Sequence, residues 1–355
     1  LPAEPDSNLF LLSLSFYYRP SSSFNNANGV PSIVQGLEFT MNKWQSGRRY
    51  EWALQWENVD PSPGAGAPEW RYWDPAPPDP FKWVDTGLAG GVSGMTWHTL
   101  VLEGGIFGAE VHYRRFILDN MIIPLDKVVT PAAAPGEPDK LAVAVQLDGN
   151  YQADPYELFI DDVTLITAES FDDVPFRYWA FDWIQRLYAA NITGGCGVAP
   201  LRYCPEDTIT RAQMAVFLER GIHGANYNPP AVGSSTGFGD VPPTHWAAAW
   251  IKQLATDGIT GGCGSGNYCP ESPVTRAQMA VFLLRSKYGW NYSPPGVGSS
   301  TGFSDVPPGH WAAAWIKQLV AEGITSGCET GTYCPEAPVT RAQMAVFLVK
   351  TFSLP

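Results

Sequence analysis

Apolar and polar residues alternate along much of the first half of the chain. Every second side chain is apolar at 12–16, 37–41, 50–56 and 141–147. A period of two places one face of a strand in a core and leaves the other face in water. Near residue 160 the phase slips by one position, which predicts a β-bulge at Asp161-Asp162. With turn signals between the runs and no convincing helical pattern, residues 1–167 are predicted to form an all-β sandwich.

After about residue 167 the apolar spacing becomes helical. Trp246, Ile251 and Leu254 fall on one stripe of a helix, and Gly258 is placed to end that helix in the left-handed conformation. A second helix is predicted to begin at Thr275, with Gln278 three residues further on. This spacing is that of a capping box, in which the Thr hydroxyl and the Gln side chain each bind the other residue's backbone N–H.

The helical half consists of three tandem sequence repeats. The text TRAQMAVFL begins at Thr210, Thr275 and Thr340, and each copy also carries F-x-D-V, a Trp-led apolar helix, I-T and two cysteines. Each copy is a helix–loop–helix unit too small to bury its own apolar faces, so the three copies should pack into one all-α body. The predicted copies are one (168–227), two (228–292) and three (293–355).

Composition narrows the class of protein. The 355 residues are 45% hydrophobic and 16% charged, which suits folded cores rather than disorder. A net charge of −13 argues against a nucleic-acid partner, and any anionic ligand must be held by local Arg or Lys. We find no apolar run long enough for membrane insertion. The chain opens at Leu1 without a Met, so we expect an extracellular protein whose signal peptide has been removed.

All six cysteines lie in the repeats, two in each copy. None forms a C-x-x-C, and the five histidines show no metal-ligand spacing, so local disulfides are favoured over zinc. Persistent disulfides indicate an oxidising, extracellular compartment. We therefore expect no metal and no cofactor. The predicted pairs are Cys196–Cys204, Cys263–Cys269 and Cys328–Cys334.

The first half resembles a concanavalin-A-like (laminin-G-like) jelly roll in text such as YEWALQWENV and LAVAVQLDGNYQADPYELFIDDVTL. The resemblance implies a fold shared by many lectins, carbohydrate-binding modules and some glucanases. Those glucanases carry E-x-D-x-x-E or E-x-D-x-E on one strand, and neither text occurs here. Because glycosidases need two carboxylates across one bond, we expect no catalytic residues and no enzyme activity.

An aromatic cluster in a Pro-rich stretch offers a possible binding or contact face: Trp70, Tyr72, Trp73, Phe81 and Trp83. Sugar rings stack on exposed indoles, and amphipathic aromatic side chains favour binding surfaces. The alternatives are a loop pinned by its own aromatics and a contact to a neighbouring subunit.

The repeats resemble the S-layer homology domain in three tandem copies, through F-x-D-V, G-I-T-x-G and T-R-A-Q-M-A-x-F-L. The resemblance implies a pseudo-threefold bundle held non-covalently to a secondary cell-wall polymer or other surface glycan. T-R-A-Q departs from the family's T-R-A-E, and the cysteine pairs are additional. The glycan-binding residues that the resemblance implies are Arg211, Arg276 and Arg341, Trp179, Trp246 and Trp311, and Gly195, Gly262 and Gly327.

Arginine at these positions has a physical rationale. It lies in the first helical turn, where free N–H groups and the helix dipole favour an anion, and its planar fork suits a carboxylate. The alternative is that each Arg pairs with the Asp of F-x-D-V, which is Asp173, Asp240 or Asp305, and only braces the bundle.

Two functions fit this pattern. The first is a non-catalytic cell-surface protein that is anchored by its repeats and has a glycan-binding or outward-facing sandwich. The second is a self-assembling subunit of a surface layer or extracellular filament, with copies of itself as partners.

Overall fold

The computed structural model describes residues 7–20, 36–57, 68–75, 83–90, 92–148 and 156–355. The chain divides into two compact units, Leu1–Arg177 and Tyr178–Pro355. The contacts group residues 168–177, which the sequence assigned to copy one, with the first unit.

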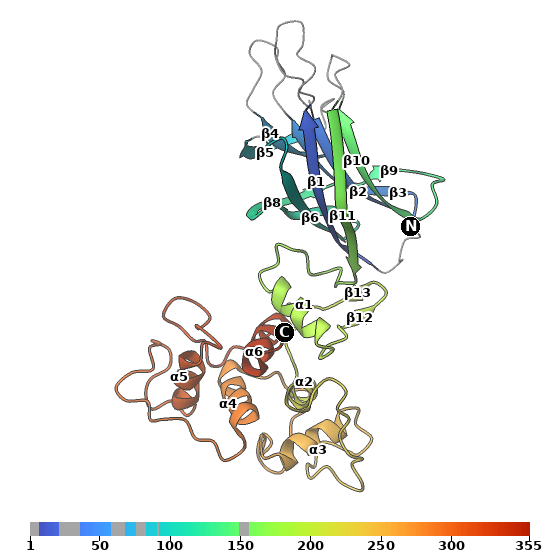
Figure 1. Cartoon of the computed structure of the whole chain (residues 1–355). Coiled ribbons are helices and arrows are strands. Elements are labelled where there is room, and N and C mark those ends of the chain that lie inside the picture. Colours follow the sequence, from blue (N-terminus) through green and yellow to red (C-terminus); the bar gives the residue numbers. More distant parts are fainter. Residues whose placement is uncertain (1–6, 21–35, 58–67, 76–82, 91, 149–155) are drawn as a thin grey trace, which may run out of the picture. The chain divides into compact units, whose positions relative to one another are not determined.

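The first unit is an all-β sandwich, as predicted, and its described part contains no helix. Its strands are β1 (Leu9–Pro20), β2 (Gly36–Gln45), β3 (Arg48–Glu57), β4 (Glu69–Trp73), β5 (Trp83–Ala89), β6 (Trp97–Phe107), β7 (Glu110–Leu118), β8 (Met121–Val129), β9 (Ala132–Ala133), β10 (Lys140–Asp148) and β11 (Tyr156–Ala168). They form two antiparallel sheets (Figure 1), in the orders β11-β1-β6-β7-β8 and β10-β2-β3-β4-β5, with β9 paired to β3.

The core of the sandwich lies between the inward faces of the alternating strands. Leu12, Leu14 and Phe16 of β1 are fully buried, as their spacing predicts. Trp52 of β3 is also fully buried, and its indole N–H donates to the carbonyl of residue 112 on the other sheet at 3.0 Å. Gly104 leaves room for this indole, because a Cβ there would lie 2.3 Å from the ring. The two sheets are thus fixed by one close-packed aromatic core.

The predicted bulge is confirmed. Along the β1–β11 pairing, Ser13 lies opposite Thr164 and Ser15 opposite Asp161, so β11 carries an extra residue, and Asp162 has φ 52°. β11 is an edge strand, and a bulge with two adjacent carboxylates disfavours pairing with another chain at that edge.

The second unit contains six helices and one short hairpin. They are α1 (Phe181–Ala189), β12 (Gly197–Val198), β13 (Leu201–Arg202), α2 (Arg211–His223), α3 (Ala248–Thr256), α4 (Arg276–Tyr288), α5 (Ala313–Ala321) and α6 (Arg341–Phe352). The second helices of the copies, α2, α4 and α6, contact one another, and α3 packs on α2, α5 on α4 and α1 on α6. Figure 1 shows this arrangement. Each second helix therefore packs on the first helix of the next copy, and the last copy packs on the first.

Short backbone bridges follow the same order. Thr210 pairs with Pro273 of copy two and Thr275 with Pro338 of copy three, while Thr340 pairs back to Thr208 of copy one. The three copies thus form one contact cycle rather than a row.

The predicted helix signals are confirmed. The Thr275 hydroxyl accepts from the Gln278 backbone N–H at 3.3 Å, and Gln278 Oε1 accepts from the Thr275 N–H at 3.4 Å. The same capping box begins α2 and α6. Gly258, with φ +70°, follows the end of α3. Within the described residues, none of the helices combines the length and apolar character required to cross a bilayer.

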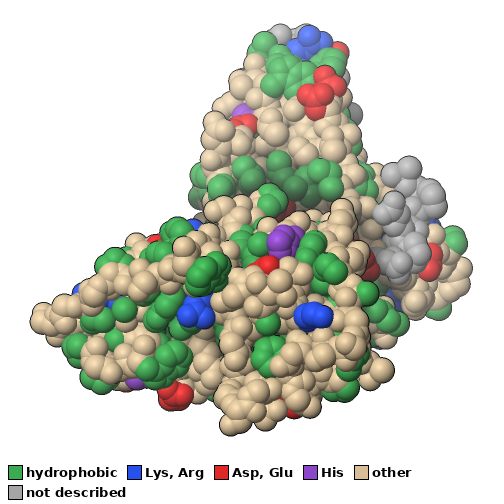
Figure 2. Space-filling model, turned by 90° about the horizontal axis from the view of Figure 1, so that it is seen from below, with side chains coloured by type: hydrophobic (Ala, Val, Ile, Leu, Met, Phe, Trp, Pro, Cys, Tyr) green, Lys and Arg blue, Asp and Glu red, His purple; other side chains and the backbone are tan. Residues whose placement is uncertain are grey.

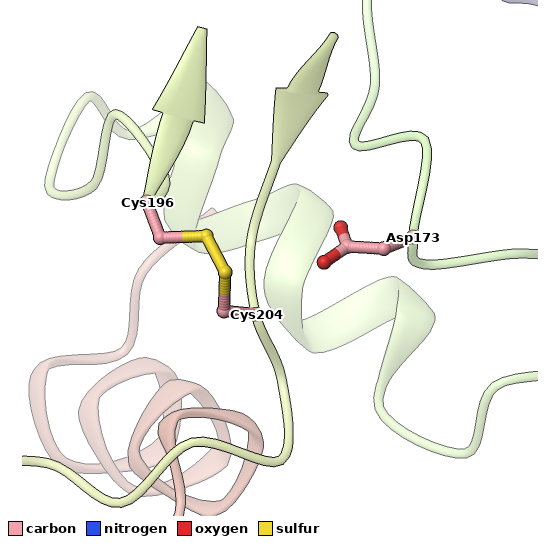
Figure 3. A group of neighbouring side chains, drawn as sticks. All are labelled: Asp173, Cys196 and Cys204. Carbon is pink, nitrogen blue, oxygen red and sulfur yellow. A yellow bond between two sulfur atoms is a disulfide. The ribbon is translucent and has the colours of Figure 1, made fainter.

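The cysteines pair within each copy as predicted: Cys196–Cys204, Cys263–Cys269 and Cys328–Cys334. Figure 3 shows the first disulfide, whose cysteines flank the β12–β13 hairpin. With every thiol oxidised, the cysteines offer no thiolate to zinc.

Candidate functional site

The arginine of each TRAQ sequence is the first residue of a central helix and is buried there. Arg211 and Arg276 are each 3% exposed and Arg341 is 5% exposed. The Nε–H of each donates to a tyrosine carbonyl in the disulfide loop of the next copy, and that tyrosine's hydroxyl donates back to the arginine carbonyl. The pairs, with the two distances, are Arg211–Tyr268 (2.7 and 2.8 Å), Arg276–Tyr333 (2.8 and 3.0 Å) and Arg341–Tyr203 (2.7 and 2.8 Å).

Aromatic rings contact the same guanidinium groups. The Arg276 guanidinium carbon lies 4.8 Å from the Tyr333 ring centre and 5.7 Å from that of Phe347. Arg211 and Arg341 have equivalent pairs of rings. Burial lowers the pKa of Arg276, while Tyr333 and Asp305 oppose that shift. Because arginine stays protonated in proteins, each of these positions carries a fixed cation.

The outer nitrogens of these groups are incompletely satisfied. Nη2 of Arg211 and Nη2 of Arg341 are buried without a hydrogen-bond partner among the residues that the structure describes. Nη2 of Arg276 reaches only the Thr325 hydroxyl, at 3.4 Å. A buried donor without a partner costs about 1–3 kcal/mol, more when charged. An anionic group on a ligand would remove that cost.

Two aspartates of F-x-D-V, Asp240 and Asp305, bind the backbone of the disulfide loop. Asp240 accepts from the N–H groups of Tyr268 and Cys269 at 2.8 and 2.7 Å. Burial opposes ionisation of Asp240, but these bonds and Arg211 lower its pKa overall. In place of the direct Arg–Asp pair considered as the alternative, Arg211 and Asp240 both bind the backbone of this loop.

A pocket of about 330 Å³ lies where all three copies meet. Its cations are Arg276 of copy two and Lys350 of copy three, and no carboxylate lines it. The structure brings three of the expected residues together here: Arg276, Gly327 and Trp179. The remaining lining residues are Ile324, Thr325, Ser326, Cys328, Gln343, Val346 and Phe347.

The tryptophans at the starts of the first helices are solvent-exposed. Trp179, Trp246 and Trp311 are each 60% exposed. Such exposure is unusual for a large indole, and its repetition in all three copies argues against a packing role. An exposed ring beside a cationic pocket is available for stacking on a sugar.

The glycines of G-I-T-x-G shape the turn that borders each arginine. Gly262 has φ +88°, and a Cβ there would lie 2.3 Å from the carbonyl oxygen of Asn267. Gly327 has φ +110°, and a Cβ would lie 2.4 Å from the carbonyl oxygen of Thr332. Gly195 also has positive φ, 85°. Glycine at these positions is thus explained by the turn, and Gly327 also lines the pocket.

Two members of the expected aromatic face of the sandwich are buried rather than exposed. Trp70 and Tyr72 are 1% and 6% exposed and lie in the core, because β4 is a strand rather than a loop. Trp73 and Trp83 contact each other edge-on at 5.2 Å and are only half-buried, so they remain candidates. Phe81 lies outside the described residues.

A different aromatic group is exposed on the sandwich. Tyr17 lies opposite Trp97 of β6 and Phe159 of β11, so the three rings share the outer face of the five-stranded sheet. Their ring centres are 5.6 and 5.9 Å from that of Tyr17, and Trp97 and Phe159 are 51% and 45% exposed. The signal was present in the alternation, since Tyr17 is out of phase with the buried Leu14 and Phe16.

Charged side chains are sparse on the face of the molecule drawn in Figure 2, where Lys and Arg appear as separate spots rather than a continuous patch. A broad basic patch of the kind that nucleic acids require is thus not seen on this face.

Comparison with known proteins identifies part of the repeat region. The family model of the S-layer homology domain matches residues 237–280 and 302–345, which lie in copies two and three. A cellulosome-anchoring protein of Acetivibrio thermocellus is 33% identical over 144 residues, 41% of this chain and 32% of that protein. A cell surface protein of Thermoanaerobacter kivui is 34% identical over 184 residues, 52% of this chain and 21% of that protein. The chain thus spans about a third or less of these relatives.

Among solved structures, the alginate lyase Aly36B matches with a TM-score of 0.32 and 12% identity, covering 46% of this chain and 72% of that chain. Within the repeats, residues 237–280 and 302–345 are thus similar in sequence to the S-layer homology domain.

Proposed function

We propose that this chain is a cell-surface protein whose three copies form one pseudo-threefold S-layer homology bundle that binds an anionic polysaccharide of the cell wall. Copy one, outside the matched segments, is included because its Arg211 and Tyr203 make the same contacts as their counterparts. The cycle of contacts would not close without it. The relatives named above, an anchoring protein and a surface protein, support attachment to the cell envelope.

The observation that carries this proposal is the charge of the pocket. The chain has a net charge of −13, yet the pocket is lined by Arg276 and Lys350 and by no carboxylate. We infer that a carboxylate or phosphate of the polymer is held by these two cations. Arg276 is already oriented by Tyr333, so little conformational entropy remains to be lost on binding. The Trp179 ring offers a face for the adjoining sugar.

The equivalent positions predict two further grooves. Lys350 is matched by Arg220 in copy one and Arg285 in copy two, ten residues after the capping threonine in each case. Arg211 would then act with Arg285, and Arg341 with Arg220. Three cationic grooves on one body would bind a repeating polymer by multivalency.

For the sandwich we propose a concanavalin-A-like jelly roll without catalytic activity. This rests on the two facing antiparallel sheets and on the lack of the paired-carboxylate text in the sequence. Trp73 and Trp83 remain the candidate glycan or subunit contact.

Wall binding tests this proposal directly. The full chain is sedimented with sacculi of the producing organism, and in parallel with sacculi stripped of their secondary polymer by hydrofluoric acid. We expect binding only to the unstripped sacculi. Trp179→Ala and Lys350→Gln should each weaken it about tenfold, as expected for about 1–2 kcal/mol of lost stacking or charge-assisted bonding.

Lys127→Gln, in the sandwich strand β8, removes the same charge from the other unit of the chain and serves as the control. Equal retention by stripped sacculi, or unchanged binding by both pocket variants, would contradict the proposal.

A second candidate function is self-assembly, favoured by the exposed group of Tyr17, Trp97 and Phe159. Contiguous exposed apolar rings mark interaction sites. If the sandwich docks on another copy, the purified chain should form higher oligomers in light scattering without added glycan, and Trp97→Ser should abolish them. A monomer at all concentrations would exclude this function.

A further inference from the structure

A mixed carboxylate–imidazole cluster joins copy one to copy two at a distance from the cationic pocket. Glu219 and His223 lie four residues apart on α2, so both project from one face of that helix. Asp257 is the C-cap residue of α3, which packs on α2. His223 Nε2 lies 3.4 Å from Glu219 Oε2 and 3.3 Å from Asp257 Oδ2.

Glu219 is the unusual member of this cluster. Its side chain is 0% exposed, and among the described residues neither carboxylate oxygen has a hydrogen-bond partner. Buried carboxylates are rarely left in this state, because desolvation without a compensating bond is costly. Its ion-pair contact is with His223, whose Nε2 lies 3.4 Å from Oε2, and no Lys or Arg of the described residues pairs with it.

The equivalent interface between copies two and three contains a lysine cation. There Lys287 Nζ contacts Glu322 Oε2 at 2.8 Å. Glu322 matches Asp257 in the repeat, and Lys287 is matched by Ile222 in copy one. Copy one has therefore lost the ammonium group at this interface.

The same alignment shows what copy one has gained. Leu284 of copy two is replaced by Glu219, and Tyr288 is replaced by His223. The supporting bond is kept: Gln253 Nε2 donates to Asp257 Oδ1 at 2.8 Å, as Gln318 does to Glu322 at 2.9 Å. Compared with copy two, copy one therefore lacks the lysine ammonium group and has an additional carboxylate and an imidazole. Carboxylate and imidazole are both ligand groups for a metal ion.

Two of the separations in this cluster match those between tetrahedral ligands. Zinc binds imidazole nitrogen and carboxylate oxygen at about 2.0–2.1 Å, so two tetrahedral ligands lie about 3.3 Å apart. The two measured separations from His223 Nε2 are 3.4 and 3.3 Å, and the three ligand atoms all lie within 4.8 Å of one another. The Tyr227 ring stacks on the imidazole, with ring centres 4.2 Å apart, and fixes its plane.

We propose that Glu219, His223 and Asp257 form a divalent cation site, with zinc as the preferred ion, that fastens α2 to α3. The three protein ligands leave one position for water, and the His223 side chain, 34% exposed, gives access from solvent. The ion has a structural role here, since it supplies at this interface the positive charge that Lys287 supplies at the next. The histidine spacing alone does not reveal this site, because its ligands are a Glu-x-x-x-His pair on α2 and an Asp at the end of α3.

The test uses the full chain, stripped of metal with EDTA and titrated with zinc chloride by calorimetry at pH 7.5, with calcium chloride in parallel. We expect one zinc ion per chain and much weaker calcium binding, because calcium prefers an all-oxygen ligand set. His223→Ala should weaken zinc binding more than about a hundredfold, beyond the loss expected for a supporting residue.

A second variant, Glu219→Leu, keeps the test decisive because it installs the residue that copy two carries at this position. In the metal-free state it should melt at a higher temperature than the unaltered chain, and zinc should no longer raise that temperature. Glu322→Gln, at the neighbouring interface, is the matched control and should leave zinc binding unchanged. The proposal is overturned if no zinc binds, or if binding persists in both His223→Ala and Glu219→Leu.

Discussion

Two glycines allow a matched test of the packing around the pocket: Gly327 directly precedes the Cys328–Cys334 loop, and Gly331 lies within it. Gly327 and Gly331 both have positive φ, +110° and +79°. A Cβ at Gly331 would meet nothing within 4 Å, whereas a Cβ at Gly327 would lie 2.4 Å from the Thr332 carbonyl oxygen and 3.0 Å from the Phe303 ring. That same oxygen accepts from the Cys328 N–H at 3.0 Å. Alanine at either position would introduce backbone strain, because φ is positive at both. Only at Gly327 must the loop also move to make room for the Cβ.

The magnitudes follow from these contacts. Gly331→Ala should cost about 1–2 kcal/mol of unfolding free energy from φ alone. Gly327→Ala should cost the same plus about 1–3 kcal/mol for overpacking and for the weakened Cys328 bond. Among the described residues helices occur only in the second unit, so urea unfolding followed at 222 nm by circular dichroism reports on this unit.

Gly327→Ala should also weaken wall binding, because Gly327 lines the pocket, while Gly331→Ala should leave it intact. Equal unfolding free energies for the two variants would refute the reasoning, since the loop would then have room for the extra methyl group.

Three other perturbations test separate parts of the bundle. Thr275→Ala removes one capping box and should cost about 1 kcal/mol in urea unfolding, with Thr256→Ala, outside any cap, as a comparison. Replacing Cys263 and Cys269 together with serine should cost about 2 kcal/mol, because the disulfide closes a short loop; a loss as large as the whole stability would be unexpected. The pKa of Asp240 is lowered in the folded state, so its stabilisation is present above about pH 4 and lost as pH falls through the folded pKa; Asp240→Asn should be less stable at pH 7 and show less of this acid loss in thermal melts.

Local features could be predicted from the sequence because their partners lie within a few residues. The capping boxes need only Thr and Gln three positions apart, and the disulfide partners lie eight or six residues apart. The bulge at Asp162 follows from a one-residue phase slip. In each case the determining contact and the pattern that reveals it occupy the same stretch of chain.

Contacts between distant segments were not accessible in this way. The Arg211 Nε–H binds a main-chain carbonyl 57 residues away, and a carbonyl has no sequence signature. Trp70 and Tyr72 were expected on a possible binding or contact face because they lie in a Pro-rich stretch, although their two-residue spacing is that of a strand. The role of Glu219 was not predicted, because the repeat pattern rests on positions that the three copies share. Glu219 is a position at which copy one differs from copy two.

The return of copy three onto copy one sets this bundle apart from open repeat arrays. In an open array the outermost units have an uncovered side and need specialised ends, and units can be added or removed. Here Arg341 of copy three binds Tyr203 of copy one, and Arg186 of copy one donates to the main-chain carbonyl of Pro355 at 2.9 Å. Copies one and three therefore meet at one junction. The number of copies is therefore fixed by geometry. Two copies would leave two packing faces uncovered, and a fourth copy would find no free face to pack on. The side chains at each interface can therefore vary, as Glu219 does at one of them, without altering the number of copies.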